Sequence, residues 1–520
     1  MHLFLQVAAL FIPTVLLYFF TLAPSITLSH FGGDGAELAT AAHTLGVAHP
    51  SGYPTYLVIA KSFSLMVPWG EQALKLNLLS AILGSSVVVL VYNITRIAIP
   101  ETSTRYKIDI VHYSIPAYLG AICLAVTPLL WTQSIITEVH SLNAFFLALV
   151  TFILLIWNAD TKKRSYLLPM GSFAFGLGLG NHLILLFLIP SIVYLLCNNR
   201  KLVSLQTAIL SAVTFLFGIS IYIYLPISAY QNPPISWGDP KDLDGFLWTV
   251  TGKPYQELVF GVPLSELPLR LIHGASLLVS QFNLIGLFIG IIGLWRLGIQ
   301  NVSIAIFTGL IFLAYWIYSA TYNTNDAHVY LLPSLIPFSI WIGIGMSWIG
   351  TRALVAFSKY STSNKSILPL IIIFLFAAVP TINLLSNYSD IDLSGQTGTL
   401  EYAREVVESV EPNALILADT DEELFPIWYY IHVVKNGPKP TILSTRLMQF
   451  NWYLRQQQRS IPEIVPYTSS DGIDYKNMAT KIVLHNLGSR PVYATRGAEF
   501  LLEQFDVDIG ERLLRVLGHP

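Results

Sequence analysis

The strongest constraint on the fold of this chain is a series of eleven long apolar stretches within its first 385 residues. Of the 520 residues, 53% are hydrophobic and only 12% are charged, against about 25% charged in typical soluble domains. Stretches of about 16 to 25 apolar residues can cross a bilayer as helices. They lie at roughly 3–22, 76–95, 112–130, 141–157, 166–180, 182–197, 203–227, 275–295, 302–320, 329–350 and 366–385. The sequence therefore predicts a polytopic α-helical membrane protein.

Two of these stretches leave an alternative open. The fifth and sixth are short, and they could form one re-entrant pair instead of two spans. The first stretch lacks the basic start of a secretory signal peptide, and it carries no evident cleavage site, so we interpret it as a retained helix.

The distribution of basic residues predicts the orientation. One set of alternating loops holds twelve Lys and Arg residues, and the opposite set holds five spread over two long loops. Cytoplasmic loops carry the excess of positive charge. The amino terminus is therefore predicted to be cytoplasmic and the carboxy terminus to lie outside, across the plasma membrane in a prokaryote or the endoplasmic reticulum membrane in a eukaryote.

The composition changes after residue 385, where charge rises and the long apolar stretches stop. The segments ALILADT, PTILST and PVYATR read as short buried strands, and helical patterns occupy 424–434, 447–457 and 475–487. This alternation predicts a small α/β domain. We expect a transmembrane domain at 1–386 and an extramembrane α/β domain at 387–520.

Several function classes are disfavoured. A formal net charge of −2 provides no basic field for nucleic acid. The chain has no G-x-x-x-x-G-K-[ST] phosphate loop, no G-x-S-x-G nucleophile motif, and no HExxH or paired CxxC spacing. ATP-driven transport and a required metal are therefore both disfavoured.

The segment HFGGDGAELATAAHTLGVAHPSGYPTY follows the first apolar stretch directly and holds two acids, Asp34 and Glu37. Their i, i+3 spacing would place both carboxylates on one side of a short helix, where one could act as a base and the other could position a hydroxyl. A capping box that only satisfies free amides is the alternative.

Other polar residues also fall in loops on the predicted outer face. Charged groups near hydrocarbon are costly unless they are paired or face a cavity, so these residues are functional candidates. They are His43, His49 and Tyr53 in the first outer loop, Glu138 and His140 in the second, Asn181 and His182 in the third, Trp237 and Asp239 in the fourth, and Asn325, Asp326 and His328 in the fifth. Hydrogen-bonded or interfacial roles without substrate are the alternative for each.

The motifs also resemble a known family. TLAPSITLSHFGGDGAEL, LGVAHPSGYPTYLVIAKSF, WTQSIITEVHSLNAF, GLGLGNHLILLFLIP, YLPISAYQNPPISWGDP and DAHVYLLPS are similar to a family once labelled a domain of unknown function. It is now grouped with the GT-C membrane glycosyltransferases, and it includes the animal transmembrane O-mannosyltransferase of immunoglobulin-like receptor domains. The segment ADTDEELFPIWYY resembles the carboxy-terminal part of the family.

The resemblance implies a GT-C fold, a polyprenyl-phosphate-linked sugar as donor, and inverting transfer on the non-cytoplasmic side. The catalytic acid of the first outer loop maps to Asp34, and the following glutamate maps to Glu37. The family pattern reads Asp-Ser-Gly-Glu, whereas this chain reads Asp-Gly-Ala-Glu. The serine hydroxyl is therefore missing, while both carboxylates remain.

These inferences predict a glycosyltransferase, with mannose as the first sugar to test and a protein Ser/Thr or glycan hydroxyl as acceptor. Asp34 would take the proton of that hydroxyl, and the phosphate leaving group would need positive charge or hydrogen-bond donors. His49, Tyr53, His182 and Arg270 are the candidates for this role. Glu138, His140, Asn181, Trp237, Asp239, Asp326 and His328 are candidates for substrate binding. The lipid-linked sugar is a co-substrate, and no further cofactor is expected.

Two other readings remain open. A transporter or flippase of lipid-linked sugars would place the acids near the middle of the bilayer, because it needs coupled proton relays. A non-catalytic scaffold would use both acids in capping and salt bridges, with no cavity beside them.

Overall fold

The computed structural model describes residues 2–99, 114–160, 163–358, 367–470 and 472–518. The predicted start of the third span at 112, the first residue of the eleventh span at 366, and five basic residues of the predicted cytoplasmic loops lie outside the described residues. Those five are Arg105, Lys107, Lys162, Lys359 and Lys365.

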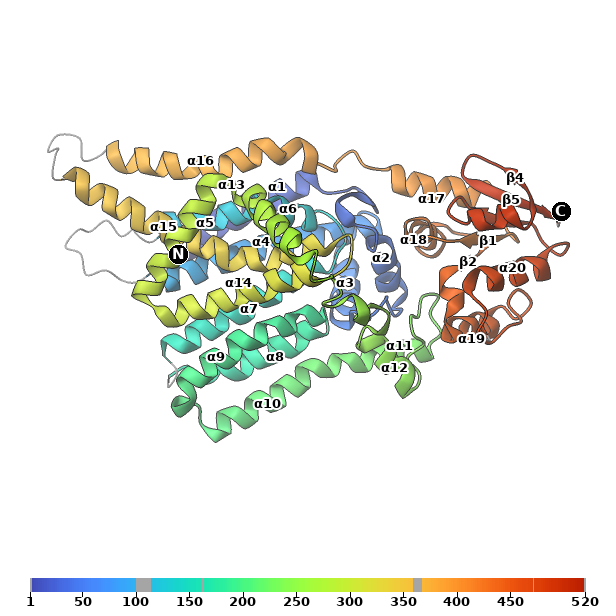
Figure 1. The fold of residues 1–520 in the computed structure, drawn as a ribbon, viewed down its shortest axis with the longest axis horizontal. Helices are drawn as coiled ribbons and strands as arrows, with labels where there is room; N and C mark the ends of the chain where they lie inside the picture. Colours follow the sequence, from blue (N-terminus) through green and yellow to red (C-terminus); the bar gives the residue numbers. More distant parts are fainter. Residues whose placement is uncertain (1, 100–113, 161–162, 359–366, 471, 519–520) are drawn as a thin grey trace.

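A bundle of apolar helices makes up most of the chain (Figure 1). Among the described residues, seven helical segments are long and apolar enough to cross a membrane, and four shorter apolar helices accompany them. The bundle consists of α1 (His2–Thr21), α4 (Gln72–Ala98), α5 (Ile115–Ala125), α7 (His140–Ala159), α8 (Leu167–Leu179), α9 (Ile189–Asn199), α10 (Leu205–Ile219), α13 (Leu267–Gln300), α14 (Val302–Thr321), α15 (Leu332–Ser358) and α16 (Ile367–Ile391). These helices occur at the positions of the predicted apolar stretches.

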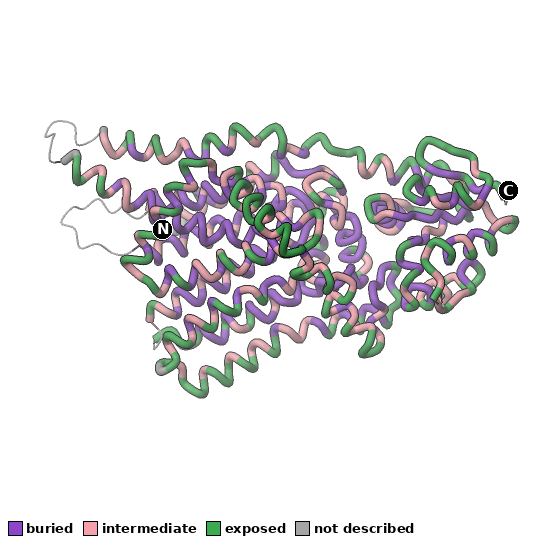
Figure 2. Tube along the Cα trace, viewed as in Figure 1, coloured by how far each residue is buried: buried purple, intermediate pink, exposed green. Residues whose placement is uncertain are grey.

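Burial separates the centre of the bundle from its lipid-facing surface. The apolar window of the segment Ala327–Ala356, which contains α15, is 94% buried, whereas that of Leu205–Tyr230, which contains α10, is only 17% buried. Figure 2 shows the same contrast between the interior and the outer helices α10 and α16. The long apolar side chains on α10 and α16 face outward, as expected of helices in contact with lipid.

Close contact between α13 and α15 depends on glycine. A Cβ built on Gly293 would lie 1.8 Å from the carbonyl oxygen of Trp341, and one built on Gly345 would lie 2.2 Å from that of Ile289. Small residues allow helices in membranes to pack backbone against backbone. These two glycines therefore set the spacing of the central helices.

Short helices occupy one end of the bundle, between it and the carboxy-terminal part (Figure 1). They are α2 (Gly35–Thr44), α3 (Pro54–Met66), α6 (Pro128–Gln133), α11 (Tyr224–Tyr230) and α12 (Leu243–Val250), with the 3₁₀ turns η1 (Ser29–Phe31), η3 (Leu183–Leu188), η6 (Lys253–Leu258) and η7 (Ala327–Leu331). All of the expected outer loops meet in this layer. The amino terminus lies toward the opposite end of the molecule from the carboxy terminus.

The carboxy-terminal part contains a five-stranded sheet with strand order β2-β1-β3-β5-β4. Its elements are α17 (Gly398–Glu408), β1 (Leu415–Ala418), α18 (Asp421–Tyr429), the π-helical turn η8 (Tyr430–Val434), β2 (Thr441–Ser444), η9 (Arg446–Gln449), α19 (Asn451–Ser460), α20 (Tyr475–Asn486), β3 (Val492–Thr495), η10 (Glu499–Glu503), β4 (Asp506–Ile509) and β5 (Leu513–Gly518). β1 pairs in parallel with β2 and β3, while β5 is antiparallel to β3 and β4. The three predicted strands are confirmed as β1, β2 and β3.

Two features differ from the expectation. β4 and β5 are additional strands, and three of the four β4 residues are exposed, so β4 lacks the apolar pattern of a buried strand. The expected boundary between residues 386 and 387 falls inside α16, which continues to Ile391. A helix that continues beyond its apolar stretch gives no compositional sign of where it ends.

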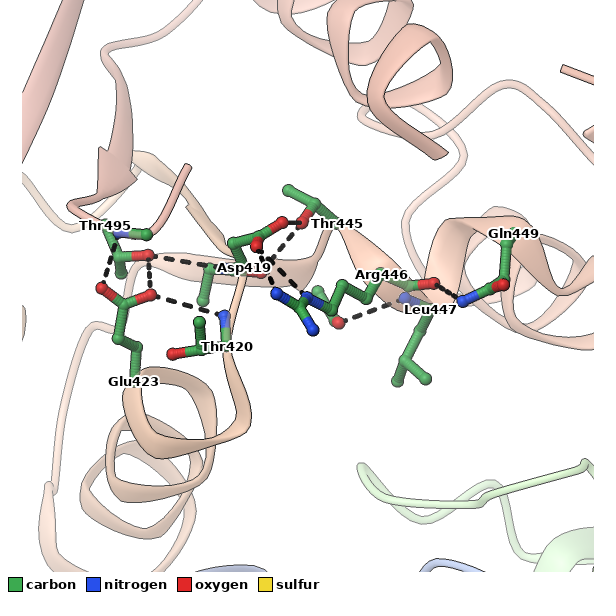
Figure 3. Close-up of polar contacts among 11 residues, drawn as sticks. Asp419, Thr420, Glu423, Thr445, Arg446, Leu447, Gln449 and Thr495 are labelled. Atoms are coloured by element: carbon green, nitrogen blue, oxygen red, sulfur yellow. Dashed lines mark hydrogen bonds and ion pairs between the residues drawn. The ribbon is translucent and has the colours of Figure 1, made fainter. Parts of the chain in front are cut away.

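A polar network links the carboxyl ends of the parallel strands (Figure 3). Asp419, which follows β1, accepts hydrogen bonds from the hydroxyl of Thr445 and from the guanidinium of Arg446, which follow β2. Glu423 accepts a hydrogen bond from the hydroxyl of Thr495 at the end of β3 and forms a capping box with Thr420 at the start of α18. The network therefore fixes α18 relative to the sheet, and α18 packs directly on α2.

Candidate functional site

The candidate site is built on α2, α3 and the loop between them. Backbone hydrogen bonds join Val47 of this loop to Ile235 and Trp237, at 2.9 and 3.1 Å, so the NPPISWGDP segment runs beside it. A proline at the first position of α3 ends the loop, because its fixed φ suits the first helical turn. His49 and Tyr53 are thereby held against α2.

An imidazole lies between the two predicted acids. Glu37 accepts hydrogen bonds from the backbone N–H of His49 at 2.9 Å and from its Nδ1 at 3.0 Å. Nε2 of His49 lies 3.6 Å from Oδ2 of Asp34 and 3.1 Å from the hydroxyl of Tyr53. The three side chains form a charged row, Glu37–His49–Asp34.

The two acids differ in exposure. The Glu37 side chain is 0% exposed, and both of its oxygens bind His49, whereas the Asp34 side chain is 49% exposed. Asp34 is the residue preceding α2, yet within the described part of the chain its side chain makes no capping hydrogen bond. The capping alternative does not account for Asp34, whose carboxylate is half exposed, whereas both oxygens of Glu37 are occupied by His49.

Gly35 explains the departure from the family pattern. A Cβ on this residue would lie 2.7 Å from the carbonyl oxygen of Thr137, in the loop before α7. Real Cβ atoms do not approach a carbonyl oxygen this closely, so a serine at this position would push the loop away from α2. The glycine allows Glu138 to approach the acid pair.

The charges of the acids control the ionisation of His49. Burial alone would lower the pKa of this imidazole, but Asp34 and Glu37 outweigh that effect and raise the pKa to about 10. At neutral pH the site therefore holds an imidazolium between two acids.

This raised pKa predicts a pH-dependent stability. The ordinary pKa of 6.5 lies below the folded value of about 10, so protonated His49 stabilises the fold fully below 6.5, and this contribution is lost as the pH rises through about 10. We expect the melting temperature of the wild-type protein in detergent to fall, relative to that of His49→Gln, between about pH 7 and about pH 10.5. Parallel melting curves for the two proteins across this range would contradict the charged row.

Aromatic and histidine rings continue from His49 toward the bundle. The ring of Tyr53 lies 4.9 Å from that of His49 and 5.7 Å from that of His182. His182 in turn lies 6.0 Å from His140 and 5.9 Å from Tyr330. Nδ1 of His182 accepts the N–H of Ile184 at 3.2 Å, so neutral His182 presents its Nε2 proton as a donor. The fold thus brings together predicted residues from three loops.

Glu138 and Asn181 are buried residues next to this cluster. Asn181 is fully buried, and its side-chain amide donates to the carbonyl oxygen of Val139 at 3.2 Å. Burial raises the pKa of Glu138 well above its usual value, and the nearby Asp34 adds to the effect. Oε1 of Glu138 has no hydrogen-bond partner among the described residues. The side-chain oxygen Oδ1 of Asn181 likewise has no partner among the described residues, so both buried side chains keep an unpaired oxygen.

Arg270 and His328 line a cavity of about 220 Å³ beside the cluster. The other lining residues are His273, Gly274, Leu277, Trp316, Ser319, Ala320, Asn325, Ala327 and Leu331. The ring of His328 lies 4.6 Å from that of Phe31, which belongs to the loop that carries Asp34. Asp326 adjoins the cavity through its neighbours Asn325 and Ala327. Through His328, the cavity thus borders the loop that carries Asp34.

Some residues differ from the sequence-based prediction. The carboxylate of Asp239 pairs with Lys241 at 3.3 Å and with the guanidinium of Arg459 on α19, so it joins the two parts of the chain and does not face Asp34. His43 lies at the end of α2, where its carbonyl accepts from Lys61. The structure does not bring these two residues into the site.

Asp421 is an acid near the site that the loop analysis did not consider. It begins α18, and partial desolvation together with the nearby charge of Asp34 raises its pKa to about 6. The motif ADTDEELF carries it, but its approach to α2 depends on how the carboxy-terminal part packs on the bundle.

Among the described residues, no group of three or more His, Cys, Asp or Glu side chains is arranged to hold a metal ion. The row Glu37–His49–Asp34 is an ion-paired arrangement in which each acid already faces the imidazole. Such an arrangement can accept a proton and stabilise a nearby charge.

Comparisons with known proteins agree with this geometry. Residues 34–205 match the family model described as the protein O-mannosyl-transferase TMEM260 N-terminal domain, and residues 399–499 match TMEM260-associated domain 2. Two segments of the chain are therefore similar to domains of TMEM260 proteins. The resemblance indicated by the motifs is therefore confirmed, and the first TMEM260 match begins at Asp34.

Two curated relatives are similar along most of the chain. Protein O-mannosyl-transferase TMEM260 of Mus musculus is 27% identical over 83% of this chain, and that of Dictyostelium discoideum is 26% identical over 94%. The matches cover 62% and 63% of these relatives. The chain therefore spans less than two thirds of the length of the TMEM260 proteins it matches.

A solved structure shows the fold. The crystal structure of ArnT from Cupriavidus metallidurans bound to undecaprenyl phosphate has a TM-score of 0.60 and 12% identity, covering 98% of this chain and 97% of ArnT. ArnT is a membrane glycosyltransferase of the GT-C fold. The predicted GT-C-like fold is confirmed, and it agrees with the seven apolar helices among the described residues that are long enough to cross a membrane.

Proposed function

We propose that this chain transfers a sugar, with mannose the first to test, from a polyprenyl phosphate to a hydroxyl of an acceptor protein. The observation that carries the proposal is the accessible Asp34 carboxylate, held beside His49 in a GT-C fold and free of any capping role. The relatives named protein O-mannosyl-transferase and the undecaprenyl phosphate bound to ArnT support the same chemistry.

The mechanism follows from the unequal acids. A Ser or Thr hydroxyl is a weak nucleophile at neutral pH, so Asp34 accepts its proton as the oxygen attacks C1 of the sugar. The bond from C1 to the phosphate oxygen breaks on the opposite face, and the configuration inverts. Positive charge builds up on the ring in the transition state. Glu37 keeps His49 in position, and His49 holds Asp34 facing the acceptor.

The donor phosphate is proposed to bind in the cavity that contains Arg270. Within the described part of the chain, no carboxylate forms an ion pair with Arg270, so its charge is available to an anion. Its neighbours Leu269, Leu271 and Ile272 are exposed apolar residues on the same helix, as expected beside a lipid chain. His273, Asn325 and His328 add hydrogen-bonding groups to the cavity.

This site predicts a donor-specific defect. Arg270→Met should raise KM for the polyprenyl-phosphate sugar about tenfold or more, because a charge-assisted contact to phosphate is lost, while KM for the acceptor stays unchanged. Arg270→Lys should be intermediate, because it keeps the charge but not the forked geometry. Arg296→Met, near the other end of α13, is the matched control. An unchanged donor KM in Arg270→Met would remove Arg270 from the site.

The membrane arrangement is also proposed. We assign eleven spans, with the amino terminus in the cytoplasm and residues after α16 outside, in the plasma membrane or the endoplasmic reticulum membrane. The basic residues of the alternating loops support this orientation, as does the position of the acid site at the end of the bundle that carries the sheet (Figure 1). A transporter would need the acids along the spans, and here they lie on a short helix that packs against α18.

The test is transfer in vitro from a panel of radiolabelled polyprenyl-phosphate sugars to Ser- and Thr-containing polypeptides and to glycans, with mass spectrometry of the product. Parallel reactions with and without a chelator measure any metal requirement, and we expect no difference between them. Transport of the lipid-linked sugar across proteoliposomes without any transfer would contradict the proposal.

A further inference from the structure

A second cavity, of about 260 Å³, lies where the NPPISWGDP segment meets the carboxy-terminal part. Residues 232–237 form one wall, and the opposite wall comes from η8, the beginning of β2, and α19. We infer that this cavity, here called the acceptor groove, binds an extended segment of the acceptor polypeptide next to its reacting Ser or Thr. The inference rests on the proposed function and names the substrate site that it requires.

Unsatisfied polar groups in the wall indicate a ligand. Oγ of Ser236 and the indole nitrogens of Trp237 and Trp452 are buried, and none has a hydrogen-bond partner among the described residues. The three residues are at most 9% exposed. Buried polar groups in folded proteins are nearly always paired, and an indole N–H can only donate. The groove therefore offers donors to carbonyl or hydroxyl oxygens of a bound molecule.

The sheet edge favours a polypeptide. β2 is the edge strand of the sheet, and Thr441 and Ile442 of this strand line the groove. The side chains of Gln456 and Gln457 on α19 project amides that can both donate and accept. Exposed edge strands bind extended peptides by backbone hydrogen bonds, and neighbouring pockets select side chains. A glycan would use the tryptophan rings and amides but not the backbone edge.

Trp237 connects the groove to the acid site. Its ring lies 6.2 Å from that of His49 and 6.1 Å from that of Trp452, so it contacts the charged row on one side and the groove wall on the other. Its backbone N–H binds Val47, two residues before His49. In a polypeptide held in the groove, only the ring of Trp237 would thus separate the chain from the imidazole of His49.

The experiment uses the full chain in detergent, polyprenyl-phosphate [³H]mannose, and a random peptide library with a central Ser or Thr. Gln456→Ala and Trp452→Phe remove groove hydrogen bonds and should raise KM for the peptides roughly five- to tenfold, with little change in kcat. Release of free mannose to water is measured without peptide in each protein, so that a defect of the donor site is distinguished from a defect in peptide binding. Gln458→Ala, on the same helix but outside the groove, is the control and should behave as wild type.

Binding is measured separately, by photo-crosslinking of the same library carrying a benzophenone, followed by mapping of the attached peptide. Attachment within residues 439–461, weakened in both groove variants, is the expected result. A wild-type peptide KM in both variants, or a defect only with an oligosaccharide acceptor, would overturn the inference. Crosslinking in the groove by a protein that turns over no donor would instead contradict the proposed function and leave the groove in place.

Discussion

Asp34→Asn is expected to lower the transfer rate by about 10²- to 10⁴-fold, the usual effect of removing a general base. The amide has nearly the same shape as the carboxylate but cannot take the proton of the acceptor hydroxyl. Asp34 is half exposed and makes no capping hydrogen bond among the described residues, so the fold should be preserved. The loss should appear in kcat, with KM for both substrates close to the wild-type values.

The matched control is Asp244→Asn, which changes an exposed acid of α12 at the same end of the molecule. It should transfer sugar at the wild-type rate. Folded Asp34→Asn protein that retained full transfer would show that the base is another group, and Asp421, whose pKa is raised to about 6, would be the next residue to substitute.

Glu37→Ala is expected to affect both stability and rate, because it leaves the buried His49 without the acceptor of two hydrogen bonds. Breaking a buried charged pair by removing one partner typically costs about 3 to 5 kcal/mol. We expect a clear drop in melting temperature in detergent. The rate should fall about ten- to a hundredfold, because His49 no longer holds Asp34 in position.

Glu37→Gln separates charge from hydrogen bonding. It keeps an oxygen acceptor for the N–H groups of His49 but removes the negative charge, so it should recover much of the stability, and the loss of stability at high pH should begin at a lower pH than in the wild type. Glu463→Ala, at an exposed position in the carboxy-terminal part, is the control for a general glutamate effect. Equal loss in Glu37→Ala and Glu463→Ala would contradict the positioning role.

Most of the membrane-spanning fold could be predicted from the sequence, because the length of an apolar stretch is itself the property that a bilayer selects. The assignment of alternating loops placed His49, His140 and His182 on one face, and the structure shows that their rings form one cluster through Tyr53. β1, β2 and β3 were predictable because they are short, apolar and bounded by turns. β4 was not, because its residues are mostly exposed and carry no apolar pattern.

The difference in burial between Asp34 and Glu37 could not be predicted from their spacing. The i, i+3 spacing places both carboxylates on one side of a helical turn, and spacing alone does not indicate which of them is buried. The loop after α2 is held by backbone hydrogen bonds of Val47, and its path brings His49 onto Glu37 and leaves Asp34 accessible. Asp421 depends on a contact between segments almost 400 residues apart, for which a single sequence carries no local signal.

The pairing of Asp239 with Arg459 gives the junction between the two parts of the chain a sensitivity to salt. Both partners belong to segments that line the acceptor groove, and the arginine is about half exposed, so mobile ions can weaken their attraction. The contact between the tilted rings of Trp237 and Trp452 is apolar and is not screened in this way. Raising the ionic strength should therefore loosen the junction at Asp239 and Arg459, while the contact between Trp237 and Trp452 is retained.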